Sequence, residues 1–290
     1  MAASISLNRV DYVYQNGTPV AYRALENVNL KILRGSFTMI VGQTGSGKST
    51  LAQLISGLIQ PSAGQISVDH FVINRKTPER TLRRVHRVVG ITFQIAEDQL
   101  FGETVWDNLV FALRNFKINQ KFWPAVKRVC RLVGLPLNLL KRSPFDLSGG
   151  QMRKVVIASV LIYRPKILVL DEPTVGLDYY SQQQLMELLV NLNRHFHLTI
   201  VMITHRVPLI AKYASRVIVM QQGRALAQVT PVHLFTNSEL LTRAGLMKPF
   251  AVRFADVLYR HGIRFSRLPL TNGELANSLA NKLKMKMNRQ

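Results

Sequence analysis

Cysteine is nearly absent from this chain of 290 residues, in which Cys130 stands alone. A single cysteine excludes an intramolecular disulfide, and we expect its side chain to act as a small buried hydrophobic group. Long hydrophobic runs are also missing. Residues 155–170, the longest candidate, are interrupted by Arg164, Pro165 and Lys166, so no run reaches the length of a membrane span. Because the amino terminus lacks the pattern of a signal peptide, the sequence predicts a cytoplasmic protein.

Acidic residues are scarce. The chain has 16 Asp and Glu against 38 Lys and Arg, which gives a formal net charge of +22. Basic residues concentrate in residues 75–87, 114–131 and 241–290. Such an excess favours an anionic neighbour, and composition leaves open whether this is nucleic acid, a phospholipid surface or an acidic protein. Solvated helix faces are the alternative explanation for part of the charge.

A glycine-rich stretch, residues 42–50, fits the pattern G-x-x-x-x-G-K-[ST]. It follows an apolar run typical of a buried strand and precedes apolar residues at helical spacing. In this context the glycines let backbone N–H groups surround phosphates, Lys48 reaches the β- and γ-phosphates, and the Ser49 hydroxyl can ligate Mg²⁺. The stretch therefore predicts an ATP or other nucleoside triphosphate site, formed by Gly42, Thr44, Gly45, Ser46, Gly47, Lys48, Ser49 and Thr50.

Two carboxylates follow a second apolar run, residues 167–170. Ligands of open α/β sheets bind at the carboxyl ends of the strands, so Asp171 is placed to hold Mg²⁺ and Glu172 to polarise an attacking water. His205 follows a third apolar run, residues 198–203. We interpret it as a contact to the γ-phosphate, with an ordinary loop histidine as the alternative.

This ordered set of motifs resembles the ATP-binding-cassette (ABC) ATPases over about residues 5–240. The resemblance implies an α/β fold: a P-loop NTPase (RecA-like) core with an antiparallel β subdomain, a helical subdomain at about residues 98–160 and a carboxyl-terminal helical extension at residues 241–290. It identifies residues 42–50 as Walker A, Asp171 and Glu172 as the end of Walker B, Gln94 as the Q-loop glutamine and Mg²⁺ ligand, Asp178 as part of the D-loop, His205 as the switch histidine, and Ser148, Gly149, Gly150 and Gln151 as the signature.

The family mechanism implies that two cassettes clamp two ATP molecules, and that the signature of each completes the site of the other. One chain alone is therefore expected to be a poor catalyst. Ser148 has a local role as well, because serine is a preferred N-cap and the apolar positions after it predict a helix.

A finer resemblance is to the A subunits of energy-coupling factor (ECF) importers, especially the A-prime subunit. It lies in Tyr12-Val13-Tyr14-Gln15, in residues 142–153 and in the segment after Gln94, where Ile95-Ala96 departs from the usual Phe-Pro. This implies an ATPase at the cytoplasmic face of the membrane that drives uptake of vitamins or other micronutrients. The implied partners are a transmembrane T subunit, a substrate-binding S subunit and a second ATPase subunit. We expect the second ATPase to be a different A subunit, with a second copy of this chain as the alternative.

The alternative is a soluble cassette ATPase that acts on nucleic acid, to which the charge of +22 would give affinity. We favour the importer, because the chain lacks the long coiled-coil insertion of the DNA-repair members and the second cassette of the translation-associated members. Nucleic acid is then not an expected partner, whereas an anionic membrane surface is, with Lys282, Lys284 and Lys286 at the last helix as contacts.

Three further predictions leave alternatives open. We expect Tyr14 to stack on adenine, although it can instead pack in the core with Tyr12. We expect Glu97 or Asp98 to accept an arginine of a T-subunit coupling helix, although both can be solvated. Residues 241–290 are expected to help pair two ATPases, with a solvated tail as the alternative.

Overall fold

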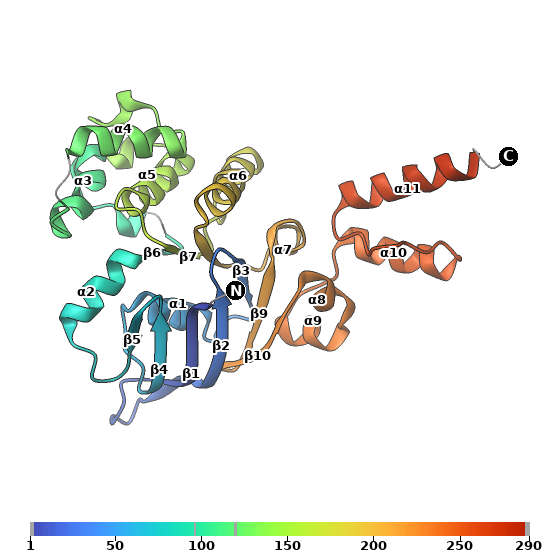
Figure 1. Ribbon diagram of the computed structural model, residues 1–290, viewed down its shortest axis with the longest axis horizontal. Coiled ribbons are helices and arrows are strands. Elements are labelled where there is room, and N and C mark those ends of the chain that lie inside the picture. The colour runs from blue at the N-terminus through green and yellow to red at the C-terminus, as the bar shows by residue number, and fades with distance from the viewer. Residues whose placement is uncertain (1–2, 96, 119–120, 288–290) are drawn as a thin grey trace.

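The computed structural model describes residues 3–95, 97–118 and 121–287, and contains two sheets and a set of helices (Figure 1). The larger sheet has the order β10-β9-β3-β8-β7-β6 and is parallel except for the edge strand β10. Its strands are β3 (Phe37–Val41), β6 (Val89–Thr92), β7 (Ile167–Asp171), β8 (Thr199–Ile203), β9 (Arg216–Gln221) and β10 (Arg224–Val229).

The smaller sheet is antiparallel, with the order β2-β1-β4-β5. Its strands are β1 (Ala3–Tyr14), β2 (Tyr22–Leu33), β4 (Ala63–Val68) and β5 (Phe71–Ile73). Buried and exposed residues alternate along β2, as expected for a sheet with one face in water. The predicted antiparallel subdomain is thus confirmed.

Helix α1 (Lys48–Ser56) is packed between the two sheets. Its Leu51, Leu54 and Ile55 are fully buried and belong to one hydrophobic cluster with β1 and with Val169 of β7. Because side chains alternate across a strand, Leu168 and other residues on the opposite face join a second cluster with α5 (Gly149–Leu161), α6 (Tyr179–Phe196) and α7 (Val207–Tyr213). Apolar residues on both faces explain why the central strands are uninterrupted hydrophobic runs.

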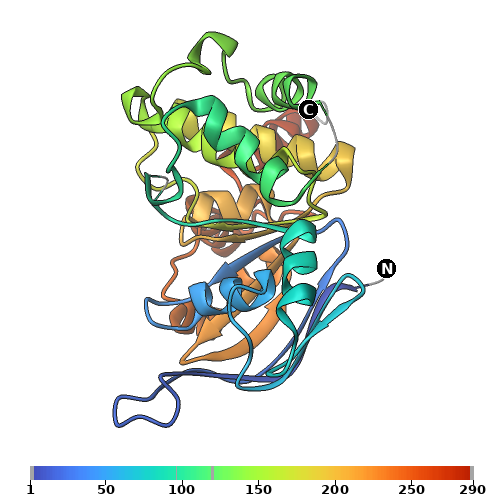
Figure 2. The ribbon, with the colours of Figure 1, turned by 90° about the vertical axis from the view of Figure 1, so that its left-hand side faces the viewer.

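The helical subdomain lies above the sheets in Figure 2 and contains α3 (Val105–Asn115), α4 (Phe122–Val133) and α5. The helix predicted after Ser148 is confirmed as α5, and Cys130 of α4 is buried, as expected. Burial raises the pKa of the Cys130 thiol to about 11, which keeps it protonated at neutral pH. Short elements in this part of the chain are η1 (Glu97–Gln99), η2 (Leu137–Leu139) and η3 (Pro144–Asp146). Helix α2 (Glu79–Val88) instead packs beside β5 and β6, and its Val85 belongs to the hydrophobic cluster of α1.

The carboxyl-terminal part is helical. Figure 1 shows α10 and α11 projecting from the cassette beyond α8 and α9. The bounds are α8 (Pro231–Thr236), α9 (Ser238–Ala244), α10 (Phe250–Arg260) and α11 (Asn272–Met287). Within the described residues, none of the helices combines the length and the apolar character needed to cross a bilayer.

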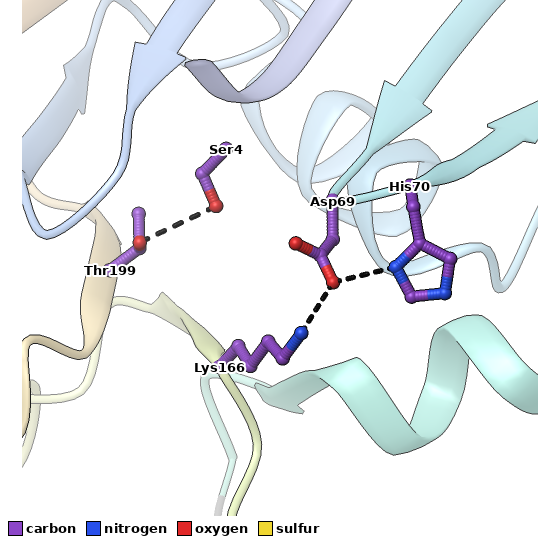
Figure 3. A network of polar contacts seen from close by, with 5 residues as sticks. All are labelled: Ser4, Asp69, His70, Lys166 and Thr199. Carbon is purple, nitrogen blue, oxygen red and sulfur yellow. Dashed lines mark hydrogen bonds and ion pairs between the residues drawn. The ribbon is translucent and has the colours of Figure 1, made fainter. Parts of the chain in front are cut away.

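A small polar network joins the two sheets at the amino ends of the parallel strands (Figure 3). Asp69, in the turn between β4 and β5, accepts a hydrogen bond of 2.7 Å from Nζ of Lys166 and lies 2.9 Å from Nδ1 of His70. The hydroxyl groups of Ser4 and Thr199 lie 3.4 Å apart beside it. The hydrogen bond from Lys166 holds the pKa of Asp69 below its usual value. The network thus fastens the antiparallel sheet to the start of β7.

Candidate functional site

A cavity of about 380 Å³ lies at the carboxyl ends of β3, β7 and β8. It brings together residues that are far apart in the sequence: the glycine-rich loop, the segment after β6, the end of β7 and the segment after β8. The lining residues are Tyr22, Ala24, Thr44, Gly45, Gly47, Lys48, Ser49, Thr50, Gln94, Asp171, Glu172, Ile203 and His205.

The glycine-rich loop needs glycine for steric reasons. Gly42 and Gly47 have φ values of 150° and 97°, which side chains rarely allow. A Cβ at Gly42 would collide with the carbonyl oxygen of Met220, and one at Gly47 would lie 2.6 Å from Cδ2 of Leu25. Gly47 also serves as the N-cap of α1, so the amino end of that helix faces the cavity. A loop of this shape at a helix amino terminus is suited to bind phosphate.

Lys48 supplies the positive charge of the loop. Its side chain is largely buried, and Nζ donates hydrogen bonds of 2.8 Å to the carbonyl oxygens of Gly42 and Gln43. Burial lowers the pKa of Lys48, while the charges of Glu172 and Asp171 act in the opposite direction. The ammonium group is therefore held at the loop by carbonyl oxygens, which a phosphate oxygen can replace.

Glu172 is the most perturbed acid of the cavity. It is 4% exposed, and its backbone has a φ of 47°, an unusual conformation for this residue type. Burial, and after it the charge of Asp171, raises its pKa to about 7, against the opposing charges of Lys48 and Arg206. Strain and a pKa near neutrality are both typical of catalytic groups.

His205 contacts this glutamate directly, with Nε2 lying 2.8 Å from Oε1 of Glu172. Burial and the charge of Lys48 lower the pKa of His205, with Asp171 opposing. The imidazole is therefore mainly neutral at neutral pH. Within the described residues, neither carboxylate oxygen of Glu172 accepts a hydrogen bond, so both stay available to a water. The pair can hold a carboxylate base in one orientation.

The oxygen donors of the cavity suit a magnesium ion. The Ser49 hydroxyl, the Gln94 side-chain amide and the Asp171 carboxylate all line the same space. Mg²⁺ prefers hard oxygen ligands and is commonly bound by one or two carboxylates together with nucleotide phosphates. The residues present thus fit the ion that the motifs predict.

The signature residues lie elsewhere. Ser148 caps α5, with its Oγ accepting from the Gln151 amide N–H and the Gln151 side chain accepting from the Ser148 N–H. Ser148, Gly150 and Gln151 line a separate cavity of about 530 Å³ that shares no lining residue with the first. The structure therefore does not bring residues 148–151 to Lys48 of the same chain.

Asp178 caps the next helix. Its Oδ1 accepts from the Ser181 amide N–H at 2.9 Å and its Oδ2 from the Ser181 hydroxyl at 2.7 Å. The hydrogen bond from the Ser181 hydroxyl, followed by that from its amide, lowers the pKa of Asp178. This carboxylate is exposed and does not line the Lys48 cavity.

The aromatic residue at the cavity differs from the one that the sequence suggests. Tyr14 does not line the cavity; its hydroxyl lies 3.1 Å from Oγ1 of Thr50, and its ring packs edge-on against Tyr12 at 4.7 Å. Tyr22, which is 57% exposed, lines the cavity instead. The role of Tyr14 at adenine stays a prediction, and Tyr22 is a second aromatic residue that sequence reasoning missed.

Arg153 was also missed. It is buried on the inner side of α5, and its guanidinium donates to the carbonyl oxygens of Phe93 at 3.2 Å, Gln94 at 2.9 Å and Val175 at 3.5 Å. One side chain thus connects the signature helix, the segment of Gln94 and the segment before Asp178. A single arginine on an otherwise apolar helix face was the available signal.

The predicted contact with a coupling helix is only partly described. Asp98 is exposed on η1, whereas the side chain of Glu97 lies outside the described residues. Their role stays a prediction.

Comparisons with known proteins agree with this geometry. The ABC transporter family matches residues 25–175. The energy-coupling factor transporter ATP-binding protein EcfA2 of Enterococcus faecalis is 42% identical over 96% of this chain and 97% of that protein. The protein of the same name from Ligilactobacillus salivarius is 42% identical over 95% of this chain and 96% of that protein.

Solved structures show the same fold. The cbiO1 protein of Clostridium perfringens, described as part of the ABC transporter complex cbiONQ, has a TM-score of 0.71 and 30% identity over 91% of this chain and 100% of that chain. A dimeric ATP-binding cassette in a post-hydrolysis state, bound to ADP and Pi, has a TM-score of 0.71 and 28% identity over 78% of this chain and 98% of that chain. The relatives favour a transport ATPase over one that acts on nucleic acid. This chain belongs to the ABC transporter ATPases and, within them, to the ATP-binding subunits of energy-coupling factor transporters.

Proposed function

We propose that Mg²⁺-ATP binds in the Lys48 cavity and that Glu172 activates the water that hydrolyses it. The observation that carries this proposal is the convergence, in one cavity, of a buried ammonium group, a strained glutamate paired with a histidine, and three oxygen donors. The enzyme is an ATPase whose hydrolysis is coupled to transport.

The protein groups have separate roles. Lys48 exchanges the carbonyl oxygens of Gly42 and Gln43 for phosphate oxygens and offsets the charge on the transferred phosphoryl group. Glu172 accepts a hydrogen bond from the attacking water, and His205 keeps its carboxylate in place. Ser49, Gln94 and Asp171 would hold Mg²⁺, which would supply positive charge to offset that of the phosphates.

The ATP site is completed by a second cassette, which we propose to be a different A subunit. The support is the distance in the fold between the signature and the Lys48 cavity, which share no residue. The amino end of α5, capped by Ser148, can face a nucleotide held by the partner, and Asp178 lies at the neighbouring helix start.

A subunits of ECF transporters work with other ATPase subunits and with membrane components. For this chain we propose a transmembrane T subunit as the element that ATP hydrolysis moves, a membrane S subunit as the carrier of the vitamin or other micronutrient, and the cytoplasmic face of the membrane as the location. Asp98, with Glu97, is the proposed acceptor for the T subunit.

Residues 241–290 are proposed to support the pairing of the two ATPases. Helix α10 exposes Phe250, Phe254, Val257 and Tyr259, and the rings of Phe250 and Phe254 stack at 5.8 Å. Exposed apolar side chains on one helix are typical of a contact surface. Lys282 and Lys284 of α11 are exposed and available to an anionic lipid surface, whereas the side chain of Lys286 lies outside the described residues.

Copurification tests these assignments. The chain is expressed with a tag in its own cells, membranes are dissolved in detergent, and the companion chains are identified. We expect one further ATPase and at least one integral membrane protein. Recovery of the chain only with nucleic acid or soluble proteins would contradict the proposal.

A further inference from the structure

A third, larger cavity of about 810 Å³ lies at the opposite edge of the parallel sheet from the Lys48 cavity. Its lining includes Arg34 before β3, Lys166 before β7 and Leu198 before β8, so it lies at the amino ends of the strands whose carboxyl ends hold the Lys48 cavity. It shares no lining residue with the Lys48 cavity. Helix α4 and the last turns of α5 and α6 supply the other walls.

The floor of this cavity is hydrocarbon. Val129, Leu161, Leu192 and Leu198 line it and are themselves buried in the core, and Phe196 adds a ring that is 65% exposed. Apart from His197 and the cationic residues, no lining residue carries a polar side chain. An apolar floor with this volume is typical of a small-molecule site.

The rim is strongly cationic. Arg34, Arg128, Arg131, Arg164 and Lys166 line the cavity, and no acidic residue does. Lys166 is already paired with Asp69 (Figure 3). Within the part of the chain that the structure describes, the side chains of the four arginines form no hydrogen bond, ion pair or ring contact.

The arginines also act on one another. Burial and the charge of Arg164 lower the pKa of Arg128, which means that its positive charge is disfavoured in this environment. An anion placed among the four guanidinium groups would relieve this repulsion. Guanidinium groups bind phosphate with two parallel hydrogen bonds, so phosphate is the anion that they fit best.

We propose that this cavity binds an anionic phospholipid, with the phosphate among Arg34, Arg128, Arg131 and Arg164 and the acyl chain on the apolar floor. A nucleotide fits less well, because the floor offers almost no polar side chains to a base or a ribose. The site uses neither the residues nor the sheet edge of the Lys48 cavity, whereas Arg131 and Leu132 also line the cavity of the signature residues.

The test is calorimetric titration of the purified full chain with short-chain phosphatidic acids, which dissolve as monomers. Dihexanoyl phosphatidic acid should bind, and dihexanoyl phosphatidylcholine should bind at least about tenfold more weakly because it lacks net charge. Each buried methylene increases affinity about fourfold, so dibutyryl phosphatidic acid should bind more than about tenfold more weakly than the dihexanoyl form. Inorganic phosphate should bind weakly or not at all.

Matched variants separate a site from general charge. The double variant Arg128→Gln/Arg164→Gln should lose about tenfold or more in affinity for dihexanoyl phosphatidic acid. The control variant Arg80→Gln/Arg84→Gln on α2 removes the same charge from exposed arginines outside the cavity. It should change the affinity for dihexanoyl phosphatidic acid less than about twofold. Phe196→Ser, at an exposed position that tolerates polar residues, should reduce the dependence on chain length.

ADP affinity should be the same in all these variants, which shows that they are folded. The proposal would be overturned by any of three results. These are equal losses of lipid affinity in both double variants, equal affinity for inorganic phosphate and for dihexanoyl phosphatidic acid, and lipid affinity that does not depend on acyl-chain length.

Discussion

Glu172 and Asp69 are two carboxylates with the same backbone conformation and opposite electrostatics. Both follow the end of a strand, and both have positive φ, 47° for Glu172 and 53° for Asp69. Glu172 lies at the carboxyl end of β7, where burial raises its pKa to about 7. Asp69 lies at the other edge of the sheet, where Lys166 donates to it and lowers its pKa.

The difference supports the proposal that the carboxyl edge of the parallel sheet carries the chemistry. Aspartate tolerates the left-handed conformation in turns and finds its partners locally, so Asp69 is an ordinary structural residue. Glutamate in that conformation, buried beside Asp171, is held there by the surrounding structure at a cost in stability. Such local conflicts are expected at functional sites and not at structural ones.

The largest contrast is expected in turnover. Glu172→Gln removes the base and should lower ATP hydrolysis at this site by about 100-fold or more, while ADP and ATP affinity change less than about threefold. Asp69→Asn should leave turnover within about twofold. Single-turnover hydrolysis in the assembled complex measures both. Equal rates for the Glu172→Gln and Asp69→Asn complexes would remove Glu172 from the chemistry.

Lys48→Ala should affect binding itself. The ammonium group now held by Gly42 and Gln43 is the one that meets phosphate, so nucleotide affinity should fall about 10- to 100-fold. Lys166→Ala, which removes the lysine at the opposite edge of the sheet, should leave affinity unchanged. Calorimetric titration with ATP measures the affinity of both variants. Similar losses of affinity in Lys48→Ala and Lys166→Ala would show that the effect is one of overall charge.

Arg153 tests whether the segments around the Lys48 cavity must be held in place for turnover. Arg153→Leu releases the carbonyl oxygens of Gln94 and Val175 and should lower turnover about tenfold, with nucleotide affinity within about twofold. Lys154→Leu is the matched control, because Lys154 is on the same helix and, among the described residues, donates hydrogen bonds to Gly134 and Gln184 and to none of the segments that Arg153 joins. Arg153→Lys should recover part of the rate. A loss of thermal stability alone, without a change in turnover, would mean that Arg153 has a purely structural role.

The smallest effects are on stability, and they should have opposite signs. Without nucleotide at pH 8, Glu172→Gln should raise the free energy of unfolding by about 1–3 kcal/mol, because the ionised buried carboxylate is lost. Asp69→Asn should lower it by about 0.5 kcal/mol, because the ion pair with Lys166 is partly screened by solvent.

The pH dependence follows from the two pKa shifts. The folded-state pKa of Glu172 is raised, so the wild type loses stability relative to Glu172→Gln as pH rises from about 4.5 through about 7. The pKa of Asp69 is lowered, so its contribution is present above the unfolded value of about 3.9 and is lost as pH falls through the folded value. Chemical denaturation from pH 3 to 8 measures the free energy of unfolding of both variants relative to the wild type. If these differences changed with pH in the same way for Glu172→Gln and Asp69→Asn, the two carboxylates would not have opposite pKa shifts.

Much of this molecule is predictable from its sequence, since its strongest signals are local. The apolar runs that precede Gly42 and Asp171 are strands, and the candidate site residues that follow them meet because parallel strands end at one edge. The roles of Tyr22 and Arg153 were not predictable, because they depend on how separate segments pack against each other. The cationic cavity was missed for the same reason: Arg34 and Arg164 are distant in the sequence.

ATP hydrolysis by the reconstituted transporter tests the central claim most directly. The chain is assembled with its second ATPase and its membrane partners in liposomes, and hydrolysis is compared with that of the isolated chain, with and without DNA or RNA. We expect turnover to rise at least about tenfold on assembly and to be unaffected by nucleic acid at physiological salt. In the Glu172→Gln complex, turnover at this site should fall about 100-fold or more. Stimulation by nucleic acid, with no stimulation by the membrane partners, would contradict the account.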